Sequence, residues 1–284
     1  MLGAMRTWQL RNSTLQLPAQ GGIMGILNVT PDSFSDGGCY HTIDAALRHA
    51  ETLIDEGALI LDIGGESTRP GSEEVDEQTE ANRTIPVIRA LRSRFPNQLL
   101  SIDTRHPDVA AQALEAGVDI INDVTGLASP HMRALCAAYP CGIILMHMQG
   151  KPRTMQQAPH YDNVIEEVRS FFEQRLALAE SDGIAPSRIC LDPGIGFGKD
   201  LEHNLLLIKH LEAIRIRNLP ILMALSRKRF MGAILGDANL PKQTPVPTVT
   251  MSLLAADAGA DLHRVHDVAP LRQALSLRHA FLSA

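Results

Sequence analysis

The sequence lacks the features by which several classes of protein are recognised. Its four cysteines have neither the CxxC spacing of zinc or redox sites nor the density of a disulfide scaffold, so we expect reduced thiols. The start of the chain lacks the apolar core of a signal peptide, and no later apolar run reaches the ~18 residues that a membrane span needs. We therefore expect a cytoplasmic protein that is neither secreted nor membrane-spanning.

The sequence also has no excess of positive charge. Its formal net charge is −6, which provides no general attraction for nucleic acid or an anionic membrane surface. Any anionic ligand must therefore be held by local basic residues. Hydrophobic residues make up 45% and charged residues 20% of the 284 positions, a composition that excludes a disordered or fibrous chain.

Short apolar runs rich in Ile, Val and Leu alternate with helical patterns along the chain. Eight runs predict strands, at residues 23–27, 59–63, 99–102, 118–121, 142–146, 189–191, 221–225 and 261–265. The intervening patterns predict helices, at 43–56, 73–95, 107–116, 131–139, 163–182, 201–217 and 249–258, with 269–282 closing the chain. Strict alternation is typical of parallel βαβ units, whose strands are buried on both faces.

Eight such units match an α/β fold, the (β/α)8 or TIM barrel, as a single domain. A doubly wound sheet is the alternative, but it more often has roughly five to seven strands and a glycine fingerprint after the first. We assign residues 21–284 to the barrel and residues 1–20 to a short N-terminal lead-in. Residues 236–247, which contain several prolines and glycines, are expected to form a long surface loop.

Polar residues follow nearly every predicted strand. In a TIM barrel the active site lies at the carboxyl ends of the strands. The residues that this topology brings to one mouth include Asn28, Asp62, Asp103, Asn122, His147, Asp192, Lys228, Arg264 and His266. Carboxylates and amides at the bottom of the barrel mouth suit a flat heterocycle, because Asp accepts from N–H groups and Asn both donates and accepts.

The last two strands carry the basic residues of this mouth. Lys228, Arg264 and His266 can hold an anion, in agreement with the frequent phosphate site after strands seven and eight of TIM barrels. Asn28 alone cannot cage a metal, but Mg²⁺ commonly takes one or two protein oxygens together with substrate phosphates and water. A Mg²⁺ ion carried by a phosphorylated substrate is therefore reasonable.

These motifs resemble those of the dihydropteroate synthase family, whose members bind a pterin and are targets of sulfonamides. The resemblance covers roughly residues 21–280 and rests on eight segments in order, at 25–38, 62–71, 101–104, 121–123, 145–150, 192–199, 226–228 and 264–267. It implies a transferase of folate biosynthesis that condenses 7,8-dihydropterin-6-ylmethyl diphosphate with 4-aminobenzoate to give 7,8-dihydropteroate and diphosphate. It also implies Mg²⁺ as cofactor and a homodimer.

The same resemblance implies roles for individual residues. The residues that would bind the substrates are Asn28, Thr68, Arg69, Asp103, Asn122, Met146, Asp192, Phe197, Lys228, Arg264 and His266. Met146 and Phe197 would wall the pterin, and Asn28 would meet both Mg²⁺ and diphosphate. The catalytic set would be Asp103, Lys228, Arg264 and His266: Arg264 and His266 stabilise the departing diphosphate, and Asp103 favours positive charge on the methylene carbon.

Two alternatives share much of this pattern. A pterin-binding methyltransferase acting on methyltetrahydrofolate would not need the segment 68–70 or the Arg264 and His266 pair. A non-catalytic paralogue would bind pterin without turnover. Arg229 and residues 243–248 also depart from the usual family pattern, which leaves the 4-aminobenzoate site, sulfonamide sensitivity and the dimer surface open.

Overall fold

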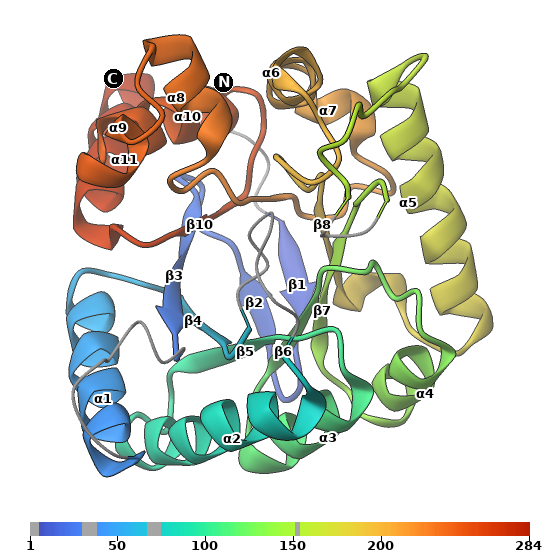
Figure 1. Ribbon diagram of the computed structural model, residues 1–284, viewed down its shortest axis with the longest axis vertical. Coiled ribbons are helices and arrows are strands. Elements are labelled where there is room, and N and C mark those ends of the chain that lie inside the picture. The colour runs from blue at the N-terminus through green and yellow to red at the C-terminus, as the bar shows by residue number, and fades with distance from the viewer. Residues whose placement is uncertain (1–5, 30–38, 67–74, 151–153) are drawn as a thin grey trace.

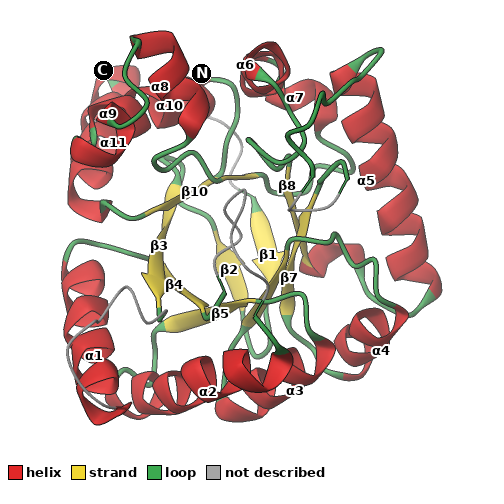
Figure 2. Ribbon diagram, viewed as in Figure 1, coloured by secondary structure: helices red, strands yellow, loops and turns green. Residues whose placement is uncertain are grey.

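Eight parallel strands form a barrel at the centre of the molecule (Figures 1 and 2). The structure is a computed structural model, and it describes residues 6–29, 39–66, 75–150 and 154–284. The barrel strands are β3 (Gly22–Asn28), β4 (Ile60–Gly64), β5 (Leu99–Asp103), β6 (Ile120–Asp123), β7 (Gly142–Met146), β8 (Ile189–Asp192), β9 (Leu222–Met223) and β10 (Leu262–Val265). The predicted (β/α)8 barrel is confirmed.

The strand order shows how the barrel closes. Neighbouring strands run in the order β8-β7-β6-β5-β4-β3-β10-β9. A parallel bridge between Leu191 and Ile221 then joins β8 to the start of β9, and the Leu191 amide donates to the Pro220 carbonyl at 2.8 Å. Closure places the carboxyl ends of all eight strands around one mouth.

Helices surround the barrel on the outside (Figure 2). They are α1 (Cys39–Asp55), α2 (Glu77–Arg94), α3 (Pro107–Ala116), α4 (Pro130–Ala138), α5 (Val164–Ser181), α6 (Leu201–Lys209), α7 (Leu211–Ile214), α8 (Arg229–Leu235), α9 (Leu240–Gln243), α10 (Val246–Asp257) and α11 (Val268–Ser283), with a 3-10 turn at Pro186–Arg188. Local signals place their ends: the Asp76 side chain accepts from the Thr79 amide at the start of α2, and Gly117, at φ 108°, ends α3. Among the described residues, none of these helices is long and apolar enough to cross a membrane.

Several predicted boundaries are wrong in the sixth and seventh barrel units, after β8 and β9. The predicted helix 201–217 is two helices, because His210 ends α6 and precedes α7. The predicted surface loop 236–247 contains α9 and the start of α10. Prolines in this segment do not break these helices, since Pro241 and Pro247 lie in first turns and Pro245 is the N-cap of α10, positions where a missing N–H costs no hydrogen bond.

An N-terminal hairpin seals the end of the barrel opposite the mouth. Strands β1 (Thr7–Gln9) and β2 (Thr14–Gln16) pair antiparallel in the segment for which the sequence predicted no element. Trp8, Leu10 and Leu17 are buried in one apolar cluster with residues from the barrel strands, among them Met24 and Ile60. The Trp8 indole N–H donates to the Arg188 carbonyl at 2.8 Å.

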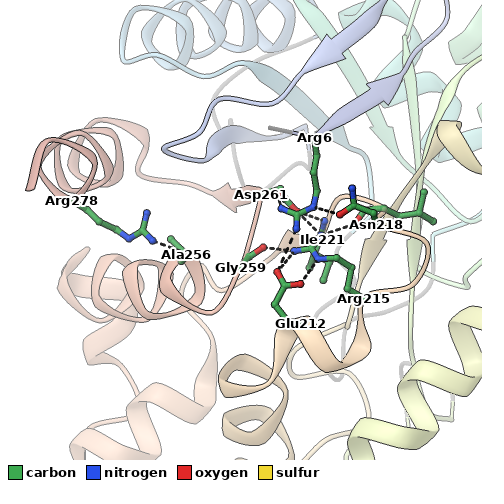
Figure 3. Close-up of polar contacts among 10 residues, drawn as sticks. Arg6, Glu212, Arg215, Asn218, Ile221, Ala256, Gly259, Asp261 and Arg278 are labelled. Atoms are coloured by element: carbon green, nitrogen blue, oxygen red, sulfur yellow. Dashed lines mark hydrogen bonds and ion pairs between the residues drawn. The ribbon is translucent and has the colours of Figure 1, made fainter. Parts of the chain in front are cut away.

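A polar network fastens this hairpin to the barrel floor (Figure 3). Asp261, which immediately precedes β10, accepts from Arg6 and Arg215 at 2.8 Å each, and also from the Ile221 amide at 2.8 Å. Arg215 is held in turn by Glu212, with Nε and Oε2 2.9 Å apart. Ligand access is therefore left to the opposite end.

Candidate active site

Strand register brings the predicted site residues to one level of the barrel. Asn28 pairs with Gly64, Gly64 with Asp103, and Asp103 with Asn122, while Asp192 pairs with Met146 at the end of β7. Each residue is therefore the last, or nearly the last, of its strand. A Cβ at Gly64 would lie 3.5 Å from the Asn28 amide oxygen, so Asn28 directs its side chain toward the end of β4.

Arg264 links three strands at the bottom of the mouth. Its Nε donates to Asp62 Oδ2 at 2.6 Å, and its Nη2 donates to Asp103 Oδ2 at 2.7 Å. The Asn122 side-chain amide also donates to Asp62 Oδ2, at 3.2 Å. Sequence analysis placed Asp62 at the rim but assigned it no role; its position, facing two other site residues, could be seen only in the folded barrel.

Two carboxylates share this single guanidinium, so negative charge is in excess. Burial raises the pKa of Asp103 to about 7; the charge of Arg264 opposes the shift, and the charge of Asp62 adds to it. Burial works to lower the pKa of Arg264, but Asp62 and Asp103 outweigh it and raise that pKa. The other oxygens, Asp62 Oδ1 and Asp103 Oδ1, are buried and have no hydrogen-bond partner within residues 6–29, 39–66, 75–150 and 154–284. Buried acceptors without a partner are rare, which indicates that ligand donors complete them.

Asp192 and Lys228 form the next part of the site. Asp192 Oδ1 accepts from the Gly194 amide at 2.7 Å, and burial raises the pKa of this carboxyl. Lys228 Nζ lies 4.4 Å from the centre of the Phe197 ring, and burial lowers its pKa to about 8 against the attraction of Asp192. An ammonium group therefore lies over the Phe197 ring, and the Asp192 carboxylate is near enough to attract it.

An apolar wall stands beside these polar groups. Met146 and Phe197 form a separate buried cluster with Val124 and Met155, and Met148 packs against it. This arrangement fits the predicted apolar contacts of Met146 and Phe197. A flat ring placed against this wall would meet the polar groups with its edge.

Lys199 and His147 hold the wall in position. Lys199 Nζ is buried and lies 2.9 Å from His147 Nδ1, and it also donates to the Phe197 and Gly194 carbonyls at 3.0 and 3.1 Å. Gly194, at φ +65°, is required because any Cβ would collide with the His147 carbonyl oxygen. Burial lowers the pKa of Lys199 to about 7, and burial together with Lys199 lowers that of His147 to about 2.

The last two strands supply the remaining basic groups. His266 Nδ1 lies 2.8 Å from Ser226 Oγ, and the same hydroxyl accepts from the His266 amide at 3.2 Å. Arg227, at φ 58°, turns toward Asp267, with Nη2 and Oδ1 3.1 Å apart. The structure places the other nine predicted site residues at this mouth. Thr68 and Arg69 lie outside the described residues, as does the segment 30–38.

Comparison with known proteins identifies the family. The model of the pterin-binding enzyme family matches residues 24–266. Dihydropteroate synthase from Escherichia coli K12 is 44% identical over 262 residues, which are 92% of each chain. The chain belongs to the dihydropteroate synthase family of pterin-binding enzymes.

Solved structures of dihydropteroate synthases agree with this assignment. The Xanthomonas albilineans enzyme with 4-aminobenzoic acid is 42% identical, with a TM-score of 0.90, and the match covers 99% of this chain and 100% of that chain. The Burkholderia cenocepacia enzyme complexed with 7,8-dihydropteroate is 40% identical, with a TM-score of 0.88 and coverage of 98% and 97%. The predicted dihydropteroate synthase function and transferase class are confirmed, and the methyltransferase and non-catalytic alternatives are not favoured.

Proposed function

We propose that this dihydropteroate synthase condenses 7,8-dihydropterin-6-ylmethyl diphosphate with 4-aminobenzoate at the mouth formed by β3–β10. The observation that carries the site assignment is the pair of unpartnered buried oxygens, Asp62 Oδ1 and Asp103 Oδ1, beside the apolar wall of Met146 and Phe197. A pterin edge offers N–H donors to such acceptors, while its face suits the wall.

The residues divide the chemistry between two ends of the substrate. Asp192 and Asn122 orient the pterin, and Lys228 lies over the Phe197 ring beside it. Arg264 and His266 stabilise the negative charge that collects on the diphosphate as the C–O bond breaks and the electron pair leaves with oxygen. The amine of 4-aminobenzoate then forms the C–N bond and loses a proton. Ionised Asp103 stabilises the positive charge on the carbon between these events.

Asn28 is our candidate protein ligand for Mg²⁺. It ends β3 at the mouth, and one amide oxygen suits an ion whose other ligands are phosphate oxygens and water. When bound, Mg²⁺ would neutralise diphosphate charge. We place Thr68 and Arg69 at the second-substrate site by family resemblance.

Product formation tests this proposal. Purified protein with Mg²⁺ and both substrates should release 7,8-dihydropteroate and diphosphate in equal amounts, and Arg264→Ala should reduce binding of diphosphate. Absence of product at saturating substrate would overturn the proposal. Methyl transfer from methyltetrahydrofolate to a corrinoid would instead support the alternative.

We further propose a cytoplasmic homodimer. Apolar side chains are exposed on α6, α8 and α10, which pack against one another at one end of the molecule (Figure 1). They are Leu201, Leu205, Ile234, Leu235, Val246 and Leu254. Light scattering should give twice the 30.9 kDa mass of one chain, and Leu254→Glu should yield monomers, whereas Leu277→Glu on α11 should not.

Free buried thiols at Cys136, Cys141 and Cys190 support a reducing compartment.

A further inference from the structure

A second group of ligating side chains lies on the segments that follow β4 and β5 and does not include Asn28. It comprises Glu66, which follows β4, Glu80 on α2, and His106, which immediately precedes α3. One ligating atom from each residue lies within 4.8 Å of the other two. The group therefore joins three consecutive parts of the barrel wall.

The chemistry of these side chains is incomplete as it stands. Glu80 is fully buried; its Oε2 accepts from Thr104 Oγ1 at 3.1 Å, but its Oε1 has no hydrogen-bond partner among the described residues. In the same part of the chain, His106 Nε2 is buried without a hydrogen-bond partner and lies 3.9 Å from Glu80 Oε2. An unsatisfied carboxylate oxygen and an unsatisfied imidazole nitrogen thus belong to two side chains that approach each other to 3.9 Å, and leaving both atoms unpaired is costly.

The far side of the imidazole explains which nitrogen is available. His106 Nδ1 lies 3.0 Å from Glu77 Oε1, so the carboxylate accepts the Nδ1–H and leaves the lone pair on Nε2. A carboxylate that holds one ring nitrogen while the other faces a cation is the usual support of a metal-binding histidine. Glu77 orients His106 in this way.

Glu66 completes the set while keeping its other contacts. Its carboxylate pairs with Arg105 through both oxygens, with Nε to Oε2 and Nη2 to Oε1 at 3.3 Å each, and its Oε1 also accepts from the Val75 amide at 3.1 Å. A carboxylate oxygen has two acceptor positions, so Oε2 keeps one of its two for a cation. Ligand atoms around a transition ion lie roughly 3–4 Å apart, so the three side chains need to close by on the order of 1 Å.

We propose that Glu66, Glu80 and His106 form a site for a divalent first-row transition ion, such as Zn²⁺, that ties Glu66 after β4 and Glu80 on α2 to the start of α3. One imidazole with two carboxylates suits such ions better than Mg²⁺, which prefers oxygen ligands alone. The site is separate from the Mg²⁺ ligand proposed at Asn28. It does not depend on the synthase reaction, because its evidence is the geometry of the rim.

Metal binding by the tag-free, metal-free chain tests the site. Co²⁺ is the probe, since its visible absorption reports its ligands, and calorimetry gives the stoichiometry. We expect one Co²⁺ per chain in the presence of millimolar Mg²⁺, its displacement by Zn²⁺, and a higher melting temperature with Zn²⁺. Absence of Co²⁺ binding by the unaltered chain would overturn the proposal and leave His106 as a bridge between Glu77 and Glu80.

Three variants separate ligation from folding. His106→Asn should abolish the Co²⁺ spectrum while preserving the fold, because Asn is a favourable residue at the start of a helix. Glu80→Gln should also abolish the spectrum, and Glu77→Gln should weaken Co²⁺ affinity about tenfold or more through loss of histidine orientation. His131→Asn, which removes an exposed histidine on α4, is the matched control and should bind as the unaltered chain does. Unchanged binding by His106→Asn with native circular dichroism would refute the site.

Discussion

Asp62→Asn is the most informative single change at the mouth, because one oxygen of Asp62 supports two other site residues and its other oxygen is one of the acceptors proposed for the pterin. Its Oδ2 receives Arg264 Nε at 2.6 Å and Asn122 Nδ2 at 3.2 Å. Asparagine has the same shape, but its one acceptor oxygen is neutral and its NH₂ group only donates. When that oxygen keeps the Arg264 and Asn122 contacts, the hydrogen bond to Arg264 loses its charge assistance, and the NH₂ group faces the ligand donors in place of Oδ1.

The expected cost follows from that contact. A hydrogen bond to a charged group contributes about 1.5–3 kcal/mol, and 1.4 kcal/mol corresponds to tenfold in an equilibrium constant, so kcat/KM for the pterin diphosphate should fall about 10- to 100-fold. Steady-state kinetics at saturating 4-aminobenzoate measure this. Asp119→Asn is the matched control: it breaks a 2.7 Å ion pair with Arg92 outside the mouth and should leave kcat/KM unchanged.

The same variant should alter the pH profile in a defined direction. Burial is the largest cause that raises the pKa of Asp103, and the negative charge of Asp62 raises it further. Removing that charge should therefore lower the pKa of Asp103. If ionised Asp103 is the active form, the acid limb of kcat should move to lower pH. An unchanged kcat/KM, or a limb that moves to higher pH, would refute the assigned network.

Three further changes test other parts of the structure. Trp8→Ala should lower the free energy of unfolding by about 3–5 kcal/mol in urea while leaving KM unchanged, because Trp8 is fully buried at the closed end; a loss under ~1 kcal/mol would contradict the packing role of the hairpin. Asp192→Asn should weaken a pterin analogue at least about tenfold by calorimetry without lowering the melting temperature, since burial already disfavours the charged carboxyl. Lys199→Met tests the lowered pKa of Lys199, which is about 7 in the folded chain. Above pH 7 the folded chain has released a proton from Lys199 that the unfolded chain still binds. The free energy of unfolding of the unaltered chain, relative to that of the variant, should therefore rise by up to about 1.4 kcal/mol per pH unit between pH 7 and 10. A flat difference would exclude that titration.

Local patterns predicted the parallel strands well because these strands are short, apolar and followed by polar residues. Predictions were poorer where a local signal has two meanings. Proline in residues 236–247 suggested a loop, yet Pro241 and Pro247 lie in first turns of helices. The N-terminal hairpin escaped prediction because its strands have three residues each, and Trp8 and Leu10 become core residues only against the barrel floor.

The sequence by itself determined the alternation of strands and helices, the side of the barrel on which the polar residues gather, and the family. These properties depend on residues close together in the chain or on motifs in a fixed order. Only the tertiary structure decided that Arg264 is shared by Asp62 and Asp103, residues from two other strands, and that Lys199 supports the loop beneath Phe197. It also decided that Glu80 and His106 face one another. Such contacts depend on barrel closure and strand register, and buried pKa values depend on charges that closure brings together.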